Sequence, residues 1–242
     1  IENMNAKGFD YEDCLVSYPT AIELVSGYIA CYKQKDPEKT ENVKFSASVI
    51  SSSVIYLEQV GSPQEVAQAT MTKVMDLLQE ILGSLKAEDI ALLNAAIMDS
   101  TIDASSVTFK GIIQGYTEGM VKKLFLDNAE SPLIDEFVQS LLSQTQAKVD
   151  STVLASLSDT INSSAVDQIV VLARGNDTVK LALLKKLISG IEKTDVAGAA
   201  KEEIIKSLDT KLSQSGIASV STIKTTIITT ETDDSDSKKK QD

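Results

Sequence analysis

Apolar side chains recur at intervals of three and four residues along most of the chain, and sustained alternation does not occur before the C-terminal tail. This period is typical of amphipathic helices that bury one face. The sequence therefore predicts an all-α protein, a multi-helix bundle of about eight to ten short helices with a disordered or strand-prone C-terminal tail. The clearest apolar stripe consists of Val66, Met71, Val74, Met75, Leu77, Leu78 and Ile81.

Prolines, glycines and polar loops divide the pattern into segments. The segment 43–60 is rich in Ser and β-branched residues, so a strand remains open there as the alternative to a helix. Ser62, Pro63 and Glu65 predict a capping box at the start of a long helix, and Ser131-Pro132 repeats the cap-plus-proline device. Helices are predicted at about 11–17, 19–34, 43–60, 63–82, 87–98, 105–126, 132–145, 150–161, 163–174, 176–189 and 194–215.

Gly111, Gly115 and Gly119 recur every four residues, which places them on one face of a predicted helix. We expect the backbone of a neighbouring helix to approach closely there, since glycine has no side chain to keep it away. Gln114, Glu118 and Lys122 make the same segment unsuitable for lipid. No apolar run in the chain is long enough for a membrane-spanning helix, so we expect no membrane span.

Residues 1–216 are expected to form the helical domain, and a boundary near 145–151 would divide it into two sub-bundles, 1–147 and 148–216. The two Ser-Pro motifs lie sixty-nine residues apart, but the sequences after them are too different to establish a repeat. Residues 217–242 are predicted to be a flexible tail that is rich in Ser, Thr and Ile and ends in charged blocks. We interpret the tail as a linker or assembly segment, with plain disorder at the end of the domain as the alternative.

The amino-acid composition limits the kinds of molecule that the protein can bind. The chain carries 35 acidic and 23 basic residues, a net charge of −12, and Arg174 is its single arginine. Binding to nucleic acid needs a clustered basic surface, so nucleic acid is excluded as a partner. Because only 5% of the residues are aromatic, the core must be built mainly from Leu, Ile, Val and Ala.

The chain contains no histidine, which removes the commonest general base and the usual activation of Ser and Cys nucleophiles. Neighbouring acids such as Glu88-Asp89, Asp135-Glu136 and Glu202-Glu203 point about 100° apart on a helix and are interpreted as solvated faces. Ser221 and Lys224 match a Ser-x-x-Lys spacing without the partner motifs of that chemistry. The sequence therefore predicts a non-enzymatic protein without catalytic residues, cofactors or metal ligands.

Cys14 and Cys31 are a candidate disulfide, provided that the chain reverses between them. Pro19 supplies a place for this reversal, and a bridge would imply an oxidising compartment. Two buried free thiols are the alternative. Asn162 and Asn176 lie in N-glycosylation sequons, which permit secretion. We accordingly expect an extracellular location.

The stretch 116–144, "YTEGMVKKLFLDNAESPLIDEFVQSLLSQ", resembles the helical units of spider silk proteins. In such units a helix ends in a Leu-Phe or Ala-Phe pair, passes through a polar loop and resumes with a helix that carries paired leucines. Tyr116, Leu124, Phe125, Leu141 and Leu142 occupy these places here. The resemblance implies a secreted structural protein whose helical domain assembles into fibre or glue, and it carries over no catalytic or ligand residues.

Two functions follow as expectations. The first is a secreted, self-assembling structural domain, and the second is a secreted helical binding module or surface antigen that recognises a protein or a small apolar ligand. The expected partners are accordingly further copies of the chain or another protein.

Overall fold

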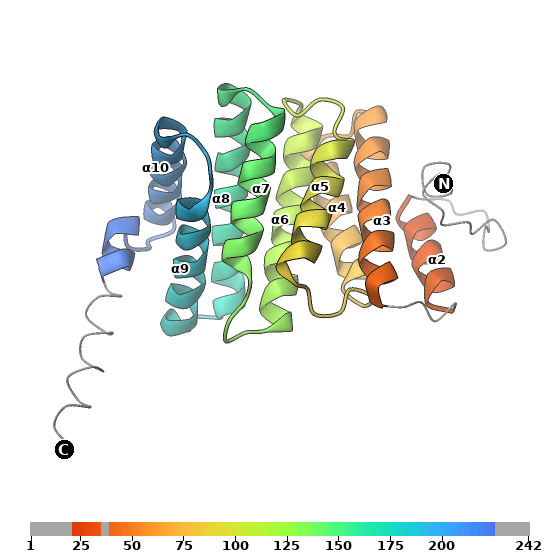
Figure 1. The fold of residues 1–242 in the computed structure, drawn as a ribbon, viewed down its shortest axis with the longest axis horizontal. Coiled ribbons are helices and arrows are strands. Elements are labelled where there is room, and N and C mark those ends of the chain that lie inside the picture. The colour runs from red at the N-terminus through yellow and green to blue at the C-terminus, as the bar shows by residue number, and fades with distance from the viewer. Residues whose placement is uncertain (1–20, 35–38, 226–242) are drawn as a thin grey trace, which may run out of the picture.

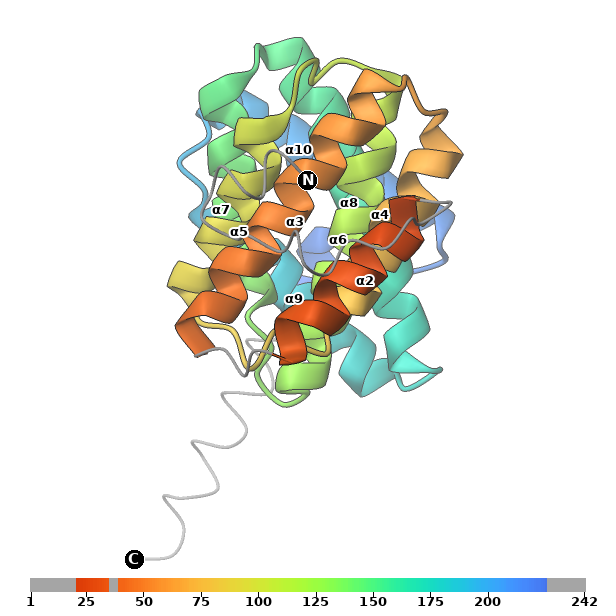
Figure 2. The same cartoon turned by 90° about the vertical axis from the view of Figure 1, so that its right-hand side faces the viewer.

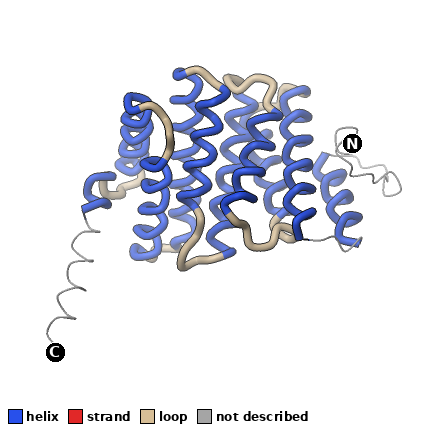
Figure 3. Tube along the Cα trace, viewed as in Figure 1, coloured by secondary structure: helices blue, strands red, loops and turns tan. Residues whose placement is uncertain are grey.

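The computed structural model of the protein describes residues 21–34 and 39–225, and every regular element in this part is a helix (Figure 3). The predicted all-α bundle is thus confirmed, whereas the helix predicted at 11–17 lies outside the described residues. The helices are α2 (Ala21–Gln34), α3 (Lys39–Gln59), α4 (Gln64–Leu78), α5 (Ala87–Ser100), α6 (Val107–Asp127), α7 (Ile134–Lys148), α8 (Ser151–Ala173), α9 (Asp177–Lys193) and α10 (Gly198–Gln214).

The helices lie in two layers, because each helix packs mainly against the next but one along the chain. The even layer consists of α2, α4, α6, α8 and α10, and the odd layer of α3, α5, α7 and α9 (Figures 1 and 2). Successive helices start 43, 43, 44 and 47 residues apart in the even layer, and 48, 47 and 43 residues apart in the odd layer. Helix pairs that recur at this length are typical of α-solenoids. The bundle is therefore built as a linear array of helix pairs.

This array explains why the two Ser-Pro motifs do not mark a repeat. Ser62-Pro63 precedes α4 in the even layer, whereas Ser131-Pro132 precedes α7 in the odd layer. The motifs therefore open helices that are not equivalent. The repeat is structural, and its length is the 43 to 48 residues between neighbours in one layer.

One continuous hydrophobic core runs between the layers. It passes the predicted boundary at residues 147 and 148 without a break, since α6 packs on α8 and α7 packs on α9. Within the described part of the chain, the predicted sub-bundles 1–147 and 148–216 thus share a single core.

The closest helix pair is α4 and α6, which meet at the three glycines of α6. A Cβ atom on Gly111 would lie 2.1 Å from the backbone oxygen of Gln64, and one on Gly115 would lie 2.4 Å from that of Gln68. The predicted close approach is thus confirmed. Because α8 covers its other side and α5 and α7 lie in the adjacent layer, α6 is buried on most of its surface.

A buried polar network joins three helices at the centre of the core. The Tyr116 hydroxyl donates to Asn94 Oδ1 at 2.8 Å, and Asn94 Nδ2 donates to the Phe137 carbonyl oxygen at 3.2 Å. Burial raises the pKa of the Tyr116 hydroxyl well above its ordinary value, so it remains a donor. These directional bonds fix α5, α6 and α7 relative to one another, which apolar contacts alone would specify less sharply.

One predicted helix is confirmed, and two others are joined into one. Segment 43–60 is helical as predicted, and not a strand: its residues 45–51 are buried, and Ser46 and Ser53 donate to carbonyl oxygens four residues earlier. Residues 151–173 form one continuous helix, not two, since no glycine or proline interrupts them and the buried face continues through Ile161 and Ala165. In both cases tertiary burial outweighs local preference.

The predicted capping box at Ser62 is absent. α4 begins at Gln64 after Pro63 and has no side-chain cap, and Ser62 is buried with its carbonyl oxygen bonded to the Thr108 hydroxyl at 2.6 Å. Val66, which was assigned to the apolar stripe, is 51% exposed. The start of α4 is therefore held by α6 and not by local capping.

The predicted tail begins later than expected. Residues 220–225 are helical, with the Val220 N–H bonded to Asp209 Oδ1 at 2.7 Å and with Val220 and Ile223 buried. The prediction of a flexible tail from residue 217 onward is therefore wrong for these residues. Two apolar residues three apart were the signal for this turn. The remainder of the predicted tail, 226–242, lies outside the described residues.

The substitution Gly111→Ala should destabilise the protein, because the new methyl group would overlap the backbone of α4 and force the two helices apart. We expect a loss of about 1–3 kcal/mol in the free energy of unfolding, measured by urea denaturation followed by circular dichroism. Gly198→Ala is the matched control, since no atom lies within 4 Å of its added Cβ. Equal stability of the two variants would contradict close packing at Gly111.

Candidate functional site

Two hollows on the even layer form one groove. The hollow beside α4 measures about 470 Å³ and the hollow between α4, α6 and α8 about 340 Å³, and both are lined by Thr72 and Asp76. We call the joined surface the α4–α8 groove. Its principal lining residues are Thr72 and Asp76 on α4, Glu118 and Lys122 on α6, and Val171 and Arg174 at the end of α8.

Three of the six charged side chains that line the groove already have protein partners. Lys122 Nζ lies 2.8 Å from Asp76 Oδ1 in an ion pair between α6 and α4. The Glu118 carboxylate accepts bonds from Gln68 Nε2 at 2.8 Å and from the Thr72 hydroxyl at 3.3 Å. These bonds hold the side chains of neighbouring helices in place and use up much of their capacity for a ligand.

Arg174 and Lys73 are the groove's cations without an ion-pair partner among the described residues, and Arg174 also has an unusual backbone conformation. Among the described residues the Arg174 guanidinium has no hydrogen-bond or ion-pair partner, although it carries five donors. Its backbone is left-handed, with φ 48° and ψ 40°, and it is the one residue other than glycine with positive φ in the described part of the chain. This conformation costs about 1 kcal/mol relative to glycine, the usual residue at such a helix end. The chain thus places its single arginine at a strained position on the edge of a groove.

Exposed aliphatic side chains accompany this arginine. Val171, one turn before Arg174, is 65% exposed, and Leu126, one turn after Lys122 on the same face of α6, is 63% exposed. This end of the groove therefore combines an unpaired cation with apolar surface. It suits a ligand that carries a carboxylate close to aliphatic groups.

The cysteine prediction falls partly outside the described residues. Cys31 is buried in α2, with 6% of its surface exposed. Cys14 lies among the residues that the structure does not describe, so a bridge between Cys14 and Cys31 stays a prediction.

The two sequons lie in different surroundings. Asn162 is fully buried in the middle of α8, and its Nδ2 donates to the Ile204 carbonyl oxygen of α10 at 3.0 Å. A glycan on this nitrogen would require α8 and α10 to separate. Asn176 is exposed at the start of α9, where its side-chain oxygen accepts the Val179 N–H. Of the two, only Asn176 presents its side chain at the surface.

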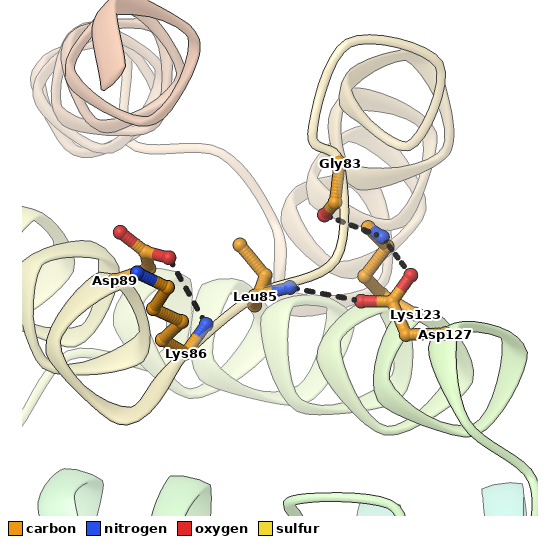
Figure 4. A network of polar contacts seen from close by, with 6 residues as sticks. All are labelled: Gly83, Leu85, Lys86, Asp89, Lys123 and Asp127. Atoms are coloured by element: carbon orange, nitrogen blue, oxygen red, sulfur yellow. Dashed lines mark hydrogen bonds and ion pairs between the residues drawn. The ribbon is translucent and has the colours of Figure 1, made fainter. Parts of the chain in front are cut away.

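Two of the neighbouring acids, Asp89 and Asp135, make structural contacts, and the interpretation of Asp135 as part of a solvated face is wrong, because its side chain is buried. Asp89 accepts the Lys86 N–H at the start of α5, as Figure 4 shows. Asp135 Oδ2 lies 2.8 Å from Lys193 Nζ and Asp135 Oδ1 lies 3.5 Å from Lys186 Nζ, so this carboxylate joins α7 to α9. Lys224, from the Ser-x-x-Lys match, forms an ion pair with Glu192. None of these contacts assembles a nucleophile with a base.

A buried lysine closes the loop between α4 and α5 (Figure 4). Lys123 Nζ donates to the Gly83 carbonyl oxygen at 3.1 Å and pairs with Asp127, whose other oxygen accepts the Leu85 N–H. The lysine therefore anchors the loop to α6 through the Gly83 carbonyl oxygen and the Asp127 carboxylate.

Over the described residues, no group of three or more His, Cys, Asp or Glu side chains is placed to hold a metal ion. None of the helices described combines the length and the apolar character needed to cross a bilayer. No protein-family model matches the chain, and neither does any curated protein.

Sequence reasoning missed the groove, although parts of it were visible. Arg174 attracted notice only as the single arginine, because the following Gly175 suggested an ordinary glycine stop. The polar residues of α4 and α6 follow helical spacing and look like any solvated face. Only the packing of α4, α6 and α8 brings them together.

Asp135 should make stability depend on pH. Burial alone raises the pKa of its carboxyl, but the hydrogen bond from Lys193 and the charges of Lys186 and Lys193 outweigh burial and lower it below its ordinary 3.8. A lowered pKa means that the contribution is fully present above 3.8 and is lost as the pH falls through the folded-state value.

We therefore expect Asp135→Asn to lower the free energy of unfolding by about 1–3 kcal/mol at neutral pH and to differ less from wild type below about pH 4. Urea titrations between neutral and acid pH measure this difference. Asp177→Asn, which removes an exposed partner of Lys180, should change stability little. If the difference in the free energy of unfolding between wild type and Asp135→Asn stayed the same below about pH 4, the lowered pKa of Asp135 would be refuted.

Proposed function

We propose that this protein is a non-enzymatic structural scaffold that associates with further copies of itself through the even layer. The observation that carries the proposal is Arg174, an unpaired cation among the described residues, held in a strained backbone beside the exposed Val171. Strain of this kind persists where the surroundings impose it, and it often accompanies a binding surface.

The architecture supports the same function. In an array of helix pairs each unit contacts only its neighbours, and the side of the array forms a long continuous surface for other chains. The α4–α8 groove lies on such a side and extends over three helices. A net charge of −12 would oppose association of identical chains at low ionic strength, so a local cation at the contact has a clear physical role.

The resemblance to the helical units of spider silk proteins agrees with an assembling structural role. An extracellular location belongs to this proposal, together with a Cys14–Cys31 bridge and a surface sequon at Asn176. Recognition of another protein is the second candidate function, favoured by the same open groove.

Sedimentation velocity of the full chain over a wide concentration range tests the proposal. We expect the average sedimentation coefficient to rise with protein concentration at moderate salt, because identical subunits then meet more often. Salt should have two opposed effects, since it relieves the repulsion between acidic chains and also weakens a contact at Arg174. A strict monomer at every concentration and salt would contradict self-association.

A further inference from the structure

The proposed self-association needs a segment that fits the α4–α8 groove, and the chain itself contains one. The stretch "IITTETDDSD", residues 227–236, places two isoleucines before four carboxylates. The end of the groove is lined by the exposed Val171 and by the unpaired Arg174. The order of apolar and acidic groups in the segment thus matches the order of apolar and basic groups in the groove.

The charges of the groove favour an acidic segment as the group that binds there. Asp76 and Lys122 neutralise each other, and Glu118 is occupied by neutral donors, so among the described residues Arg174 and Lys73 are the groove's cations that remain open to a carboxylate, and only Arg174 lines the groove beside the exposed Val171. An arginine fork binds a carboxylate with two parallel hydrogen bonds, which adds direction to the charge attraction. The segment from Glu231 to Asp236 carries four acids and no base.

The geometry points to a second copy as the source of the segment. Lys224, just before the end of the described chain, pairs with Glu192 near the C-terminal end of α9, whereas Arg174 immediately precedes the N-terminal end of that helix. At 1.5 Å per residue, Glu192 lies about 22 Å along α9 from Asp177. The three residues from Thr225 to Ile228 extend over about 10 Å at most.

The groove lies on the side of α8 that faces α6, which places it further from the C-terminal residues of the same chain. Val171 lines the groove together with residues of α6, whereas α10 packs on α8 as its other neighbour in the even layer. Residues 220–225 are fastened to α9 and α10 at the end of the array (Figure 1). The isoleucines of the same chain would have to pass around α8 or α10 to reach Val171.

We propose that the α4–α8 groove receives residues 227–236 of a second copy, with the isoleucines against Val171 and a carboxylate on Arg174. This inference rests on the proposed self-association and identifies its contact. Each copy offers one groove and one segment at different places, so the contact is head-to-tail and can continue from copy to copy.

A labelled synthetic peptide of residues 225–237, titrated into the full chain and followed by fluorescence anisotropy, tests the contact. We expect saturable binding that weakens as salt rises. Arg174→Gly should weaken it at least about tenfold, because the charged hydrogen bonds are lost. The same variant should unfold at a higher urea concentration than wild type, since glycine relieves the left-handed backbone. A loss of binding therefore cannot be ascribed to unfolding.

A matched pair of aliphatic substitutions tests the apolar part of the proposed contact, in which the isoleucines lie against Val171. Val171 and Ile102 are 65% and 64% exposed, but only Val171 lines the groove. Val171→Ala should weaken peptide binding about threefold, whereas Ile102→Ala should leave it unchanged. Equal binding by wild type and Arg174→Gly, or equal effects of the two alanine variants, would overturn the inference.

Sedimentation separates this inference from the proposed function. If wild type and Arg174→Gly associate equally, the scaffold function stands and the groove contact is wrong. If wild type stays monomeric, self-association is wrong, whatever the peptide does.

Discussion

The close packing of α4 against α6 is the constraint on which the rest of the structure depends. Three glycines four residues apart leave room on one face of α6, and α4 fills it with its backbone at Gly111 and Gly115 and with the Met75 side chain at Gly119. α6 thereby becomes the central helix of the even layer, with α8 on its other side. The α4–α8 groove lies over these three helices, so its shape follows from how closely they approach.

The sequence predicts the helices better than their arrangement. Period-3.6 patterning places most of the helices, and the glycine spacing in α6 predicts the close approach, because both features depend on residues near in the chain. The layered array could not be predicted in this way. Equivalent helices start 43 to 48 residues apart, and they share a burial pattern without sharing recognisable sequence.

The errors have local physical causes. Ser62 resembles a helix cap, but its place in the fold is decided by Thr108 on another helix. Asn162 resembles a modification site, yet the contact with Ile204 buries it. Arg174 was noticed for its rarity and not for its conformation, which no pattern of neighbours reveals. For Ser62 and Asn162, a residue distant in sequence determines the outcome.

The proposed scaffold depends on two separate features, the packing of its helices and an acidic segment near its C-terminus. Rigid packing between helices fixes the groove, and in the proposed contact an acidic, aliphatic segment would supply the attraction between copies. Because groove and segment lie at different places on the chain, assembly can be altered at Arg174 without harming the fold. This separation distinguishes the contact from an apolar interface, in which binding and stability share the same residues.

The most direct measurement is zero-length carbodiimide cross-linking of an equal mixture of ordinary and ¹⁵N-labelled chains, analysed by mass spectrometry. The account predicts links between Lys122 in the groove and the acids of residues 231–236, with one labelled and one unlabelled partner in about half of the pairs, as random mixing of copies requires. Links confined to peptides of the same isotope, or no link between this groove and those acids, would contradict it.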